Sequence, residues 1–212
     1  MNRGIPKPCT SIITQVIVDP EDPAFQHPSK PIRALHEPGR GREPSAGKGL
    51  CHDGDAGRGW RRIVASPKPR DIVEIETIRA LFNAGQVVIA GGGGGIPVIR
   101  EGNHLRGMGA VIDKDFCSCL MAQQVDADVL IILTAVEKCA ITSARAPAVA
   151  GPHEHRGGPP LLRRGPVRPG LHAAQGGSRH KFAESAPGRR SLITLLEKAK
   201  DGIEGKTGTV IE

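Results

Sequence analysis

Apolar residues gather in short blocks along the chain, and stretches rich in proline and glycine separate them. The block 11–18, SIITQVIV, is β-branched and closes at an Asp-Pro pair, which predicts a strand. The run 61–64, RRIV, predicts a second short strand. QVVIA (86–90) predicts a short buried strand. DVLIILTAV (128–136) is a near-continuous apolar run, which is typical of parallel strands covered on both faces.

Segments with helical periodicity lie between these strands. The helix predicted within 71–85 carries its apolar side chains on one face, and these are Ile72, Ile75, Ile78, Leu81 and Phe82. Gly85 is placed to end this helix in the left-handed conformation. A second helix runs through Phe116, Leu120 and Val125, and Asp115 can cap it. Strand, helix and strand at this spacing predict an α/β fold with an open, mostly parallel sheet.

The regular spacing of apolar residues is lost in two segments and returns near the end of the chain. Residues 33–52 and 140–180 follow neither a helical nor a strand period. From residue 181 onward, KFAES predicts the end of a helix, SLITLLEKA a strand or helix start, and GKTGTVI a terminal strand after a glycine turn. The expected organisation is a main unit over 1–139, a disordered segment rich in Pro, Gly and Arg over 140–180, and the end of the main unit over 181–212.

Composition excludes several classes of protein. Of 212 residues, 38 % are hydrophobic and 2 % aromatic, with 28 Gly, 18 Pro and no Tyr. This composition excludes an aromatic-rich sandwich, a collagen and a coiled coil. No apolar run approaches the roughly 20 residues that span a bilayer, and the first residues have no apolar signal region. The expectation is a cytoplasmic protein that does not contact a membrane.

The net charge of +7 raises the question of nucleic-acid binding. The excess positive charge lies in two segments, +5 in 140–180 and +2 in 33–52, and the rest of the chain is neutral. No aromatic side chains are interleaved with these arginines to stack on bases. Nucleic acid is therefore not an expected partner.

Neither a disulfide framework nor a metal site is predicted. The five cysteines are Cys9, Cys51, Cys117, Cys119 and Cys139, an odd number without a CxxC pair, and we expect reduced thiols. His153-Glu154-His155 offers two imidazoles but no third ligand. The sequence therefore assigns no residue to a metal.

Three stretches could carry chemistry. Gly91–Gly95 follows a predicted strand, where consecutive glycines let backbone N–H groups approach an anion; the alternative is a flexible loop. In Asp113-Lys114-Asp115, a lysine beside a helix start favours a phosphate; the alternative is a charged turn that caps the helix. Residues 133–138, LTAVEK, end a buried strand where a nucleotide could rest. None of these is a Walker A motif.

Together, five stretches resemble the carbamate kinases of the amino-acid kinase fold family. They are TQVIVDPEDPAFQHPSKPI (14–32), DAGRGWRRIVASPKPRDIVEIETIRAL (55–81), VVIAGGGGGIPVI (87–99), GMGAVIDKDFCSCLMAQQVDADVLIILTAVEK (107–138) and SLITLLEKAKDGIEGKTGTVI (191–211). The resemblance implies an αβα sandwich, incomplete here, with a remnant of a protruding subdomain at about 20–66. It also implies the reaction ATP + carbamate ⇌ ADP + carbamoyl phosphate with Mg²⁺, in arginine catabolism, and often a homodimer.

The resemblance also implies roles for individual residues. Lys114 and Asp115 match the lysine that contacts the transferred phosphoryl group and the aspartate that organises the site. Lys30 matches a lysine that reaches the site from the protruding subdomain. The glycine run beside carbamate corresponds to Gly92, Gly93, Gly94 and Gly95. The stretch near the nucleotide, ATP or ADP, corresponds to Thr134, Ala135, Val136 and Lys138.

The sequence departs from the family pattern in three places. Family members begin with a strand and a phosphate-binding GGNA loop; this chain starts just before TQV, so we expect that loop to be absent. Residues 33–52 do not match, and 140–180 replaces a segment that ends in PGSM-x-PK. Both blocks are basic between matching flanks, which indicates out-of-frame reading, a sequencing error or a real insertion. The alternatives to an active carbamate kinase are an inactive truncated or frameshifted remnant, and another small-molecule kinase of the same fold.

Overall fold

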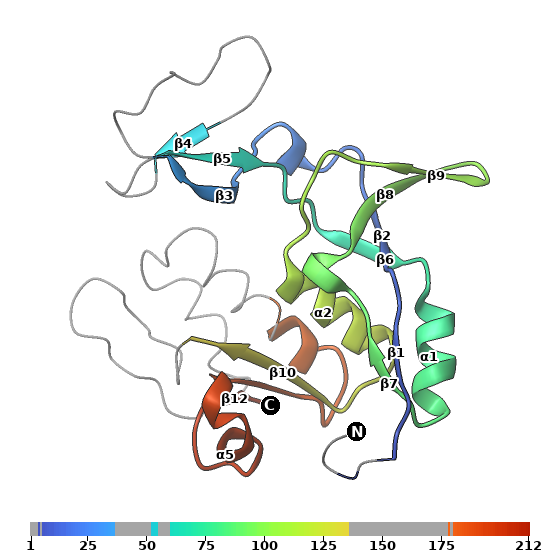
Figure 1. Ribbon diagram of the computed structural model, residues 1–212, viewed down its shortest axis with the longest axis vertical. Coiled ribbons are helices and arrows are strands. Elements are labelled where there is room, and N and C mark those ends of the chain that lie inside the picture. Colours follow the sequence, from blue (N-terminus) through green and yellow to red (C-terminus); the bar gives the residue numbers. More distant parts are fainter. Residues whose placement is uncertain (1–3, 5, 37–51, 55–59, 136–177, 179) are drawn as a thin grey trace.

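A four-stranded sheet, which we call the central sheet, organises the first part of the molecule (Figure 1). The computed structural model describes residues 4, 6–36, 52–54, 60–135, 178 and 180–212. Strand β2 (Gln15–Val18) lies between β6 (Pro69–Ile72), which is antiparallel to it, and β8 (Ile96–Glu101), which is parallel to it. Strand β9 (His104–Gly107) pairs with the other edge of β8 in antiparallel fashion.

Two further parallel pairs establish the α/β class. Strand β1 (Cys9–Ser11) pairs with β7 (Val87–Ile89), and β10 (Val129–Thr134) pairs with β11 (Arg190–Leu195). Strand β12 (Thr209–Ile211) is antiparallel to β11. The predicted fold class is confirmed, and the antiparallel partners make the sheets mixed.

A separate three-stranded sheet lies at the top of the view in Figure 1. Its antiparallel strands, in the order β3-β5-β4, are β3 (Lys30–His36), β5 (Trp60–Val64) and β4 (His52–Gly54). We call it the hairpin sheet. The strand predicted at 61–64 is confirmed by β5. The hairpin sheet falls within the residues assigned to a protruding subdomain, whose boundaries stay a prediction.

Helices connect and cover these strands. The elements are η1 (Pro23–Phe25), α1 (Ile75–Asn83), η2 (Gly92–Gly94), α2 (Lys114–Gln124), η4 (Leu196–Lys198) and α5 (Ala199–Ile203). Gly85 follows α1 with φ +77°, the predicted left-handed stop. Helical residues end at Ala183, as KFAES predicted, and the stretch after residue 190 is a strand followed by helical turns.

Helix α2 joins two hydrophobic clusters. The first contains Val16, Val18, Ile72, Ile75, Ile78, Ile99, Ile112 and Cys117, from the central sheet and both long helices. The second contains Cys119, Ala122, Leu130, Ile132, Phe182 and Ile193. Because Cys117 and Cys119 point into different clusters, burial on two sides holds α2 in place between the central sheet and β10. The site described below is built at the first turn of this helix.

The predicted strand 11–18 is two strands with a break at residues 12–14. The backbone changes partner there, because β1 pairs with β7 whereas β2 pairs with β8. Within the break, the carbonyl of Thr14 accepts a hydrogen bond from the N–H of Ile96 at 2.8 Å. A run of β-branched residues predicts extended backbone but not the point at which the partner changes.

The predictions for the helix within 71–85 and for the strand at 86–90 were wrong in part. Ile72 belongs to β6, where it lies opposite Val16. It was assigned to the helix because it lies at helical spacing from the apolar residues that follow it. Phe82 at the end of α1 is exposed. Val87 and Ile89 of β7 are also exposed, because β7 pairs with β1 in a two-stranded sheet.

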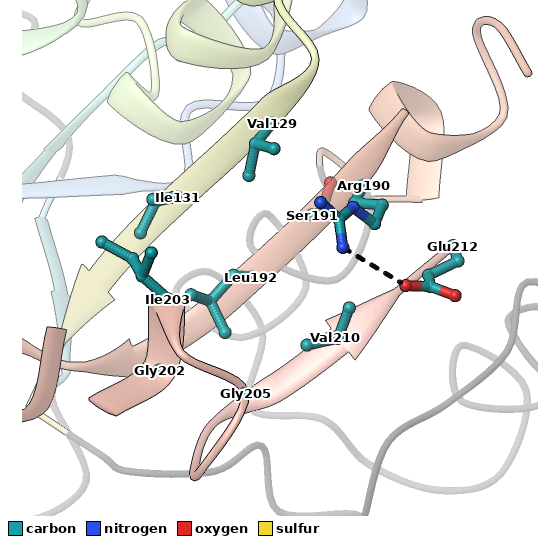
Figure 2. Close-up of a pocket in the computed structure, with 10 residues that line it drawn as sticks. All are labelled: Val129, Ile131, Arg190, Ser191, Leu192, Gly202, Ile203, Gly205, Val210 and Glu212. Carbon is teal, nitrogen blue, oxygen red and sulfur yellow. Dashed lines mark ion pairs between the residues drawn. The ribbon is translucent and has the colours of Figure 1, made fainter. Parts of the chain in front are cut away.

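Strand β10 is covered on one face by the described part of the chain. Leu130 and Ile132 are buried, whereas Val129, Ile131 and Leu133 are exposed, so the prediction of a strand covered on both faces is corrected. A groove of about 490 Å³ lies on the exposed face, and Figure 2 shows the residues that line it. Its walls are largely apolar: Leu192 of β11 and Val210 of β12 lie on the same face of the sheet as Val129 and Ile131, Ile203 of α5 lies beside them, and an Arg190–Glu212 ion pair of 3.9 Å lies at the rim.

Several expectations fall outside the described residues. They concern most of the segments 33–52 and 140–180, the pair His153 and His155, and Cys51 and Cys139. Among the helices that the structure describes, none has the length and apolar character needed to cross a bilayer.

The three described cysteines have free thiols, and we expect them to differ sharply in reactivity. Burial raises the pKa of the Cys117 and Cys119 thiols to about 11, with Lys181 opposing the shift at Cys119, whereas Cys9 is exposed. The thiolate is the nucleophile, so these two thiols stay neutral and unreactive below that pKa. Iodoacetamide at about pH 8 should modify Cys9 in the folded chain, and Cys117 and Cys119 only after denaturant is added, as peptide masses would report. Equal labelling of all three would contradict the packing of α2.

Candidate active site

The glycine run forms a tight turn against the start of α2. Gly91, Gly93, Gly94 and Gly95 have positive φ angles, which side chains rarely adopt. A Cβ on Gly94 would lie 2.3 Å from the carbonyl oxygen of Ile112, and a Cβ on Gly95 would lie 2.4 Å from Val16 Cγ2. Gly92 and Gly93 instead face open space, with nothing within 4 Å of an added Cβ. Their N–H groups begin the turn and have no acceptor within it.

The first turn of α2 presents three charged side chains. Asp113 rather than Asp115 is the N-cap: its side chain accepts the N–H of Asp115 at 2.9 Å, which corrects the predicted cap. Asp115 is in the first helical turn, its side chain 6 % exposed, and its Oδ1 accepts from Lys114 Nζ at 3.2 Å. The Lys114 side chain is 61 % exposed. Its ammonium is therefore oriented by a buried carboxylate and open to a ligand.

Lys30 reaches the same place from the hairpin sheet. It is the first residue of β3, and its Nζ lies 2.5 Å from Asp113 Oδ2, with side chains 28 % and 10 % exposed. The structure thus brings Lys30, Lys114, Asp115 and the glycine turn together. Two ammonium groups and two carboxylates balance in charge, and backbone N–H groups lie beside them, an arrangement suited to a transferring anionic group.

The predicted nucleotide stretch is described in part. Thr134 ends β10 half-buried and Ala135 follows it, exposed, while Val136 and Lys138 lie outside the described residues. Where the structure is described, Thr134 makes no polar contact with Lys30 or Lys114. The nucleotide residues therefore stay a prediction. The apolar groove of Figure 2 contains none of the predicted site residues, so we place the site at the glycine turn.

Two residues of the site were assigned no role from the sequence. Asp113 was singled out only as part of the charged triplet at 113–115; since an Asp before an apolar helical run is a cap signal, its role as the cap could have been predicted. Thr14 could not: it is buried, and its Oγ1 accepts the N–H of Gly91 at 2.8 Å across 77 residues of sequence. That bond holds the start of the glycine turn in place, and no local sequence pattern predicts it.

The chain is similar in sequence to known proteins. The model of the Amino acid kinase family matches residues 34–139. The carbamate kinase-like protein YqeA of Escherichia coli (strain K12) is 51 % identical over 220 residues, covering 100 % of this chain and 68 % of that protein. The carbamate kinase of Pyrococcus horikoshii is 41 % identical and covers 99 % of this chain and 67 % of that protein.

The chain is similar in fold to solved structures as well. The carbamate kinase from Giardia lamblia bound to AMP-PNP superposes with a TM-score of 0.85 at 34 % identity, covering 99 % of this chain and 67 % of that one. The same enzyme bound to citric acid gives a TM-score of 0.87 at 34 % identity, with 99 % and 66 % covered. The chain belongs to the amino acid kinase family. Within it, these relatives are carbamate kinases and a carbamate kinase-like protein, and the chain spans about two thirds of their length.

Proposed function

We propose that this protein is a carbamate kinase, which transfers a phosphoryl group reversibly between ATP and carbamate to give ADP and carbamoyl phosphate. One observation carries the proposal: Lys30 and Lys114, from distant elements, meet beside the glycine turn at the start of α2. The resemblance of sequence and fold to carbamate kinases supports the choice of substrate.

In the direction of ATP synthesis, an oxygen of the terminal phosphate of ADP attacks the phosphorus of carbamoyl phosphate. The bond from phosphorus to the carbamate oxygen breaks, and carbamate leaves. Charge on the moving group is spread over three equatorial oxygens, so catalysis depends mainly on positioning and electrostatic stabilisation. In our proposal Lys114, Lys30 and the N–H groups of Gly92 and Gly93 supply that stabilisation, and Asp115 orients Lys114.

The nucleotide binds near Thr134 and Ala135 in this proposal, and Mg²⁺ enters with it as part of the substrate. No group of three or more His, Cys, Asp or Glu side chains that could hold a metal is found where the structure is described. Asp115 Oδ2 is buried, with no hydrogen-bond partner in that part of the chain, and it suits a cation or its bound water. The role in arginine catabolism and the homodimer stay predictions from the resemblance, and the cytoplasmic location stays a prediction from the sequence pattern.

The test is ATP formation by the purified chain from carbamoyl phosphate and Mg·ADP, read by coupled luciferase. We expect ATP to appear with carbamoyl phosphate and not with acetyl phosphate or an acyl phosphate of an amino acid. ATP from one of those donors instead would favour another kinase of the same fold. Absence of ATP with every donor, in a chain that unfolds cooperatively, would favour the inactive remnant.

A further inference from the structure

Among the described residues, Asp113 makes three polar contacts, and they join two parts of the fold. Its Oδ1 accepts the N–H of Asp115 at 2.9 Å, and its carbonyl accepts the N–H of Cys117 at 3.0 Å, so it caps and begins α2. Its Oδ2 pairs with Lys30 Nζ at 2.5 Å. The carboxylate therefore connects the hairpin sheet to the helix that carries Lys114.

Helix capping by itself does not explain an aspartate here. Asn and Ser cap about as well as Asp, because one side-chain oxygen suffices for the helix N–H. The second oxygen of a carboxylate, with its charge, is what the Lys30 ammonium requires. Lysine also has a long flexible stem, so an unpaired Lys30 would sample many positions.

A backbone contact lies beside the ion pair. Lys30 is opposite Val64 in the hairpin sheet, and the carbonyl of the next residue, Ala65, accepts the N–H of Val111 at 2.9 Å. Val111 is two residues before Asp113. The ion pair and the backbone bond thus attach the base of the hairpin sheet at two adjacent points just before α2.

From these contacts we infer that Asp113 is a positioning residue: it holds the Lys30 ammonium beside the glycine turn, so that Lys30 and Lys114 act on the same anionic substrate. This inference rests on the proposed function. It predicts that loss of the Asp113 charge acts through Lys30 and loosens the attachment of the hairpin sheet, while α2 keeps its cap.

The test compares Asp113→Asn and Asp113→Ser, which both keep a capping oxygen, with the wild-type chain. Hydrogen exchange measured by mass spectrometry should become faster in peptides covering 30–32 and 62–64 and stay unchanged in the peptide covering β10. Asp19→Asn is the matched control. Asp19 likewise accepts a backbone N–H, from Glu21 at 3.0 Å, and pairs with a cation, Arg70 at 3.1 Å. This control should leave the exchange of both hairpin peptides unchanged.

Kinetics provide the second readout. Asp113→Asn should raise KM for carbamoyl phosphate about tenfold, the loss expected for one charge-assisted contact, and should have no further effect in a Lys30→Ala background. Unchanged exchange, or additive effects of the two substitutions, would overturn the inference and leave Asp113 as a cap alone. If the wild-type chain makes no ATP, the proposed function fails, and the exchange data still decide whether Asp113 holds the hairpin sheet.

Discussion

Replacing Lys114 with alanine is expected to lower the rate of ATP formation by about 10²–10³-fold, the usual cost of removing one preorganised electrostatic contributor. The Lys114 ammonium lies 3.2 Å from a buried carboxylate and is otherwise open to a ligand. Its loss removes positive charge from the position where the moving phosphoryl group carries negative charge. Because the side chain is exposed and alanine is a strong helix former, the fold should be unaffected.

The measurement is the luciferase-coupled rate, with thermal unfolding of each variant alongside. Lys200→Ala in α5 is the matched control, since it makes the same change in a helical lysine that is 89 % exposed and lies 3.9 Å from Glu204. It should keep the wild-type rate. Lys114→Arg preserves the charge but not the shape of the ammonium, and an intermediate rate is expected. A wild-type rate in Lys114→Ala would remove Lys114 from the catalytic residues.

Replacing Gly94 with alanine should have the largest effect on stability. The residue has φ +103°, and the new Cβ would lie 2.3 Å from the carbonyl oxygen of Ile112 and 3.0 Å from its carbonyl carbon. Backbone cannot move aside like a flexible side chain, so the turn or the start of α2 must shift. Left-handed strain and overpacking together should lower the free energy of unfolding by about 2–4 kcal/mol. Thermal unfolding should show a melting temperature lower by roughly 5–15 °C.

Two neighbouring glycines serve as controls for that substitution. Gly93 has φ +68° and open space around an added Cβ. Gly93→Ala should therefore lower the free energy of unfolding only by the left-handed strain, about 1–2 kcal/mol. Gly92 has neither a positive φ nor an atom close to an added Cβ, so Gly92→Ala should leave the free energy of unfolding unchanged. A loss of activity in Gly92→Ala at full stability would locate the substrate at this turn. Equal melting temperatures for Gly94→Ala and Gly92→Ala would contradict the close approach of the turn to Ile112.

The locally encoded elements could be predicted from sequence to a useful degree. The apolar run before Thr134 is strand β10, the periodic segment ending near Gly85 is α1, and the strand at 209–211 follows its glycine turn. The charged triplet at 113–115 and the glycine run were singled out as candidate chemistry, and the structure places them against each other.

The sequence did not predict which strands pair or which faces of the strands are buried. The pattern of residues 11–18 is continuous although the strand is broken, because the two halves pair with different strands. Val87 and Ile89 are as apolar as core residues, yet their two-stranded sheet leaves them exposed. Apolar character indicates that a residue can be buried, and only the neighbouring elements determine whether it is.

The α/β class, the glycine turn and the charged residues near it could be read from local pattern, because hydrophobic period, turn chemistry and charge are local properties. The packed fold alone shows that Lys30 and Asp113, 83 residues apart, form an ion pair, and that Thr14 accepts a hydrogen bond from a turn 77 residues away. Such contacts arise when separately formed elements pack. Their geometry depends on sheet order and helix placement, which no single segment of the chain encodes.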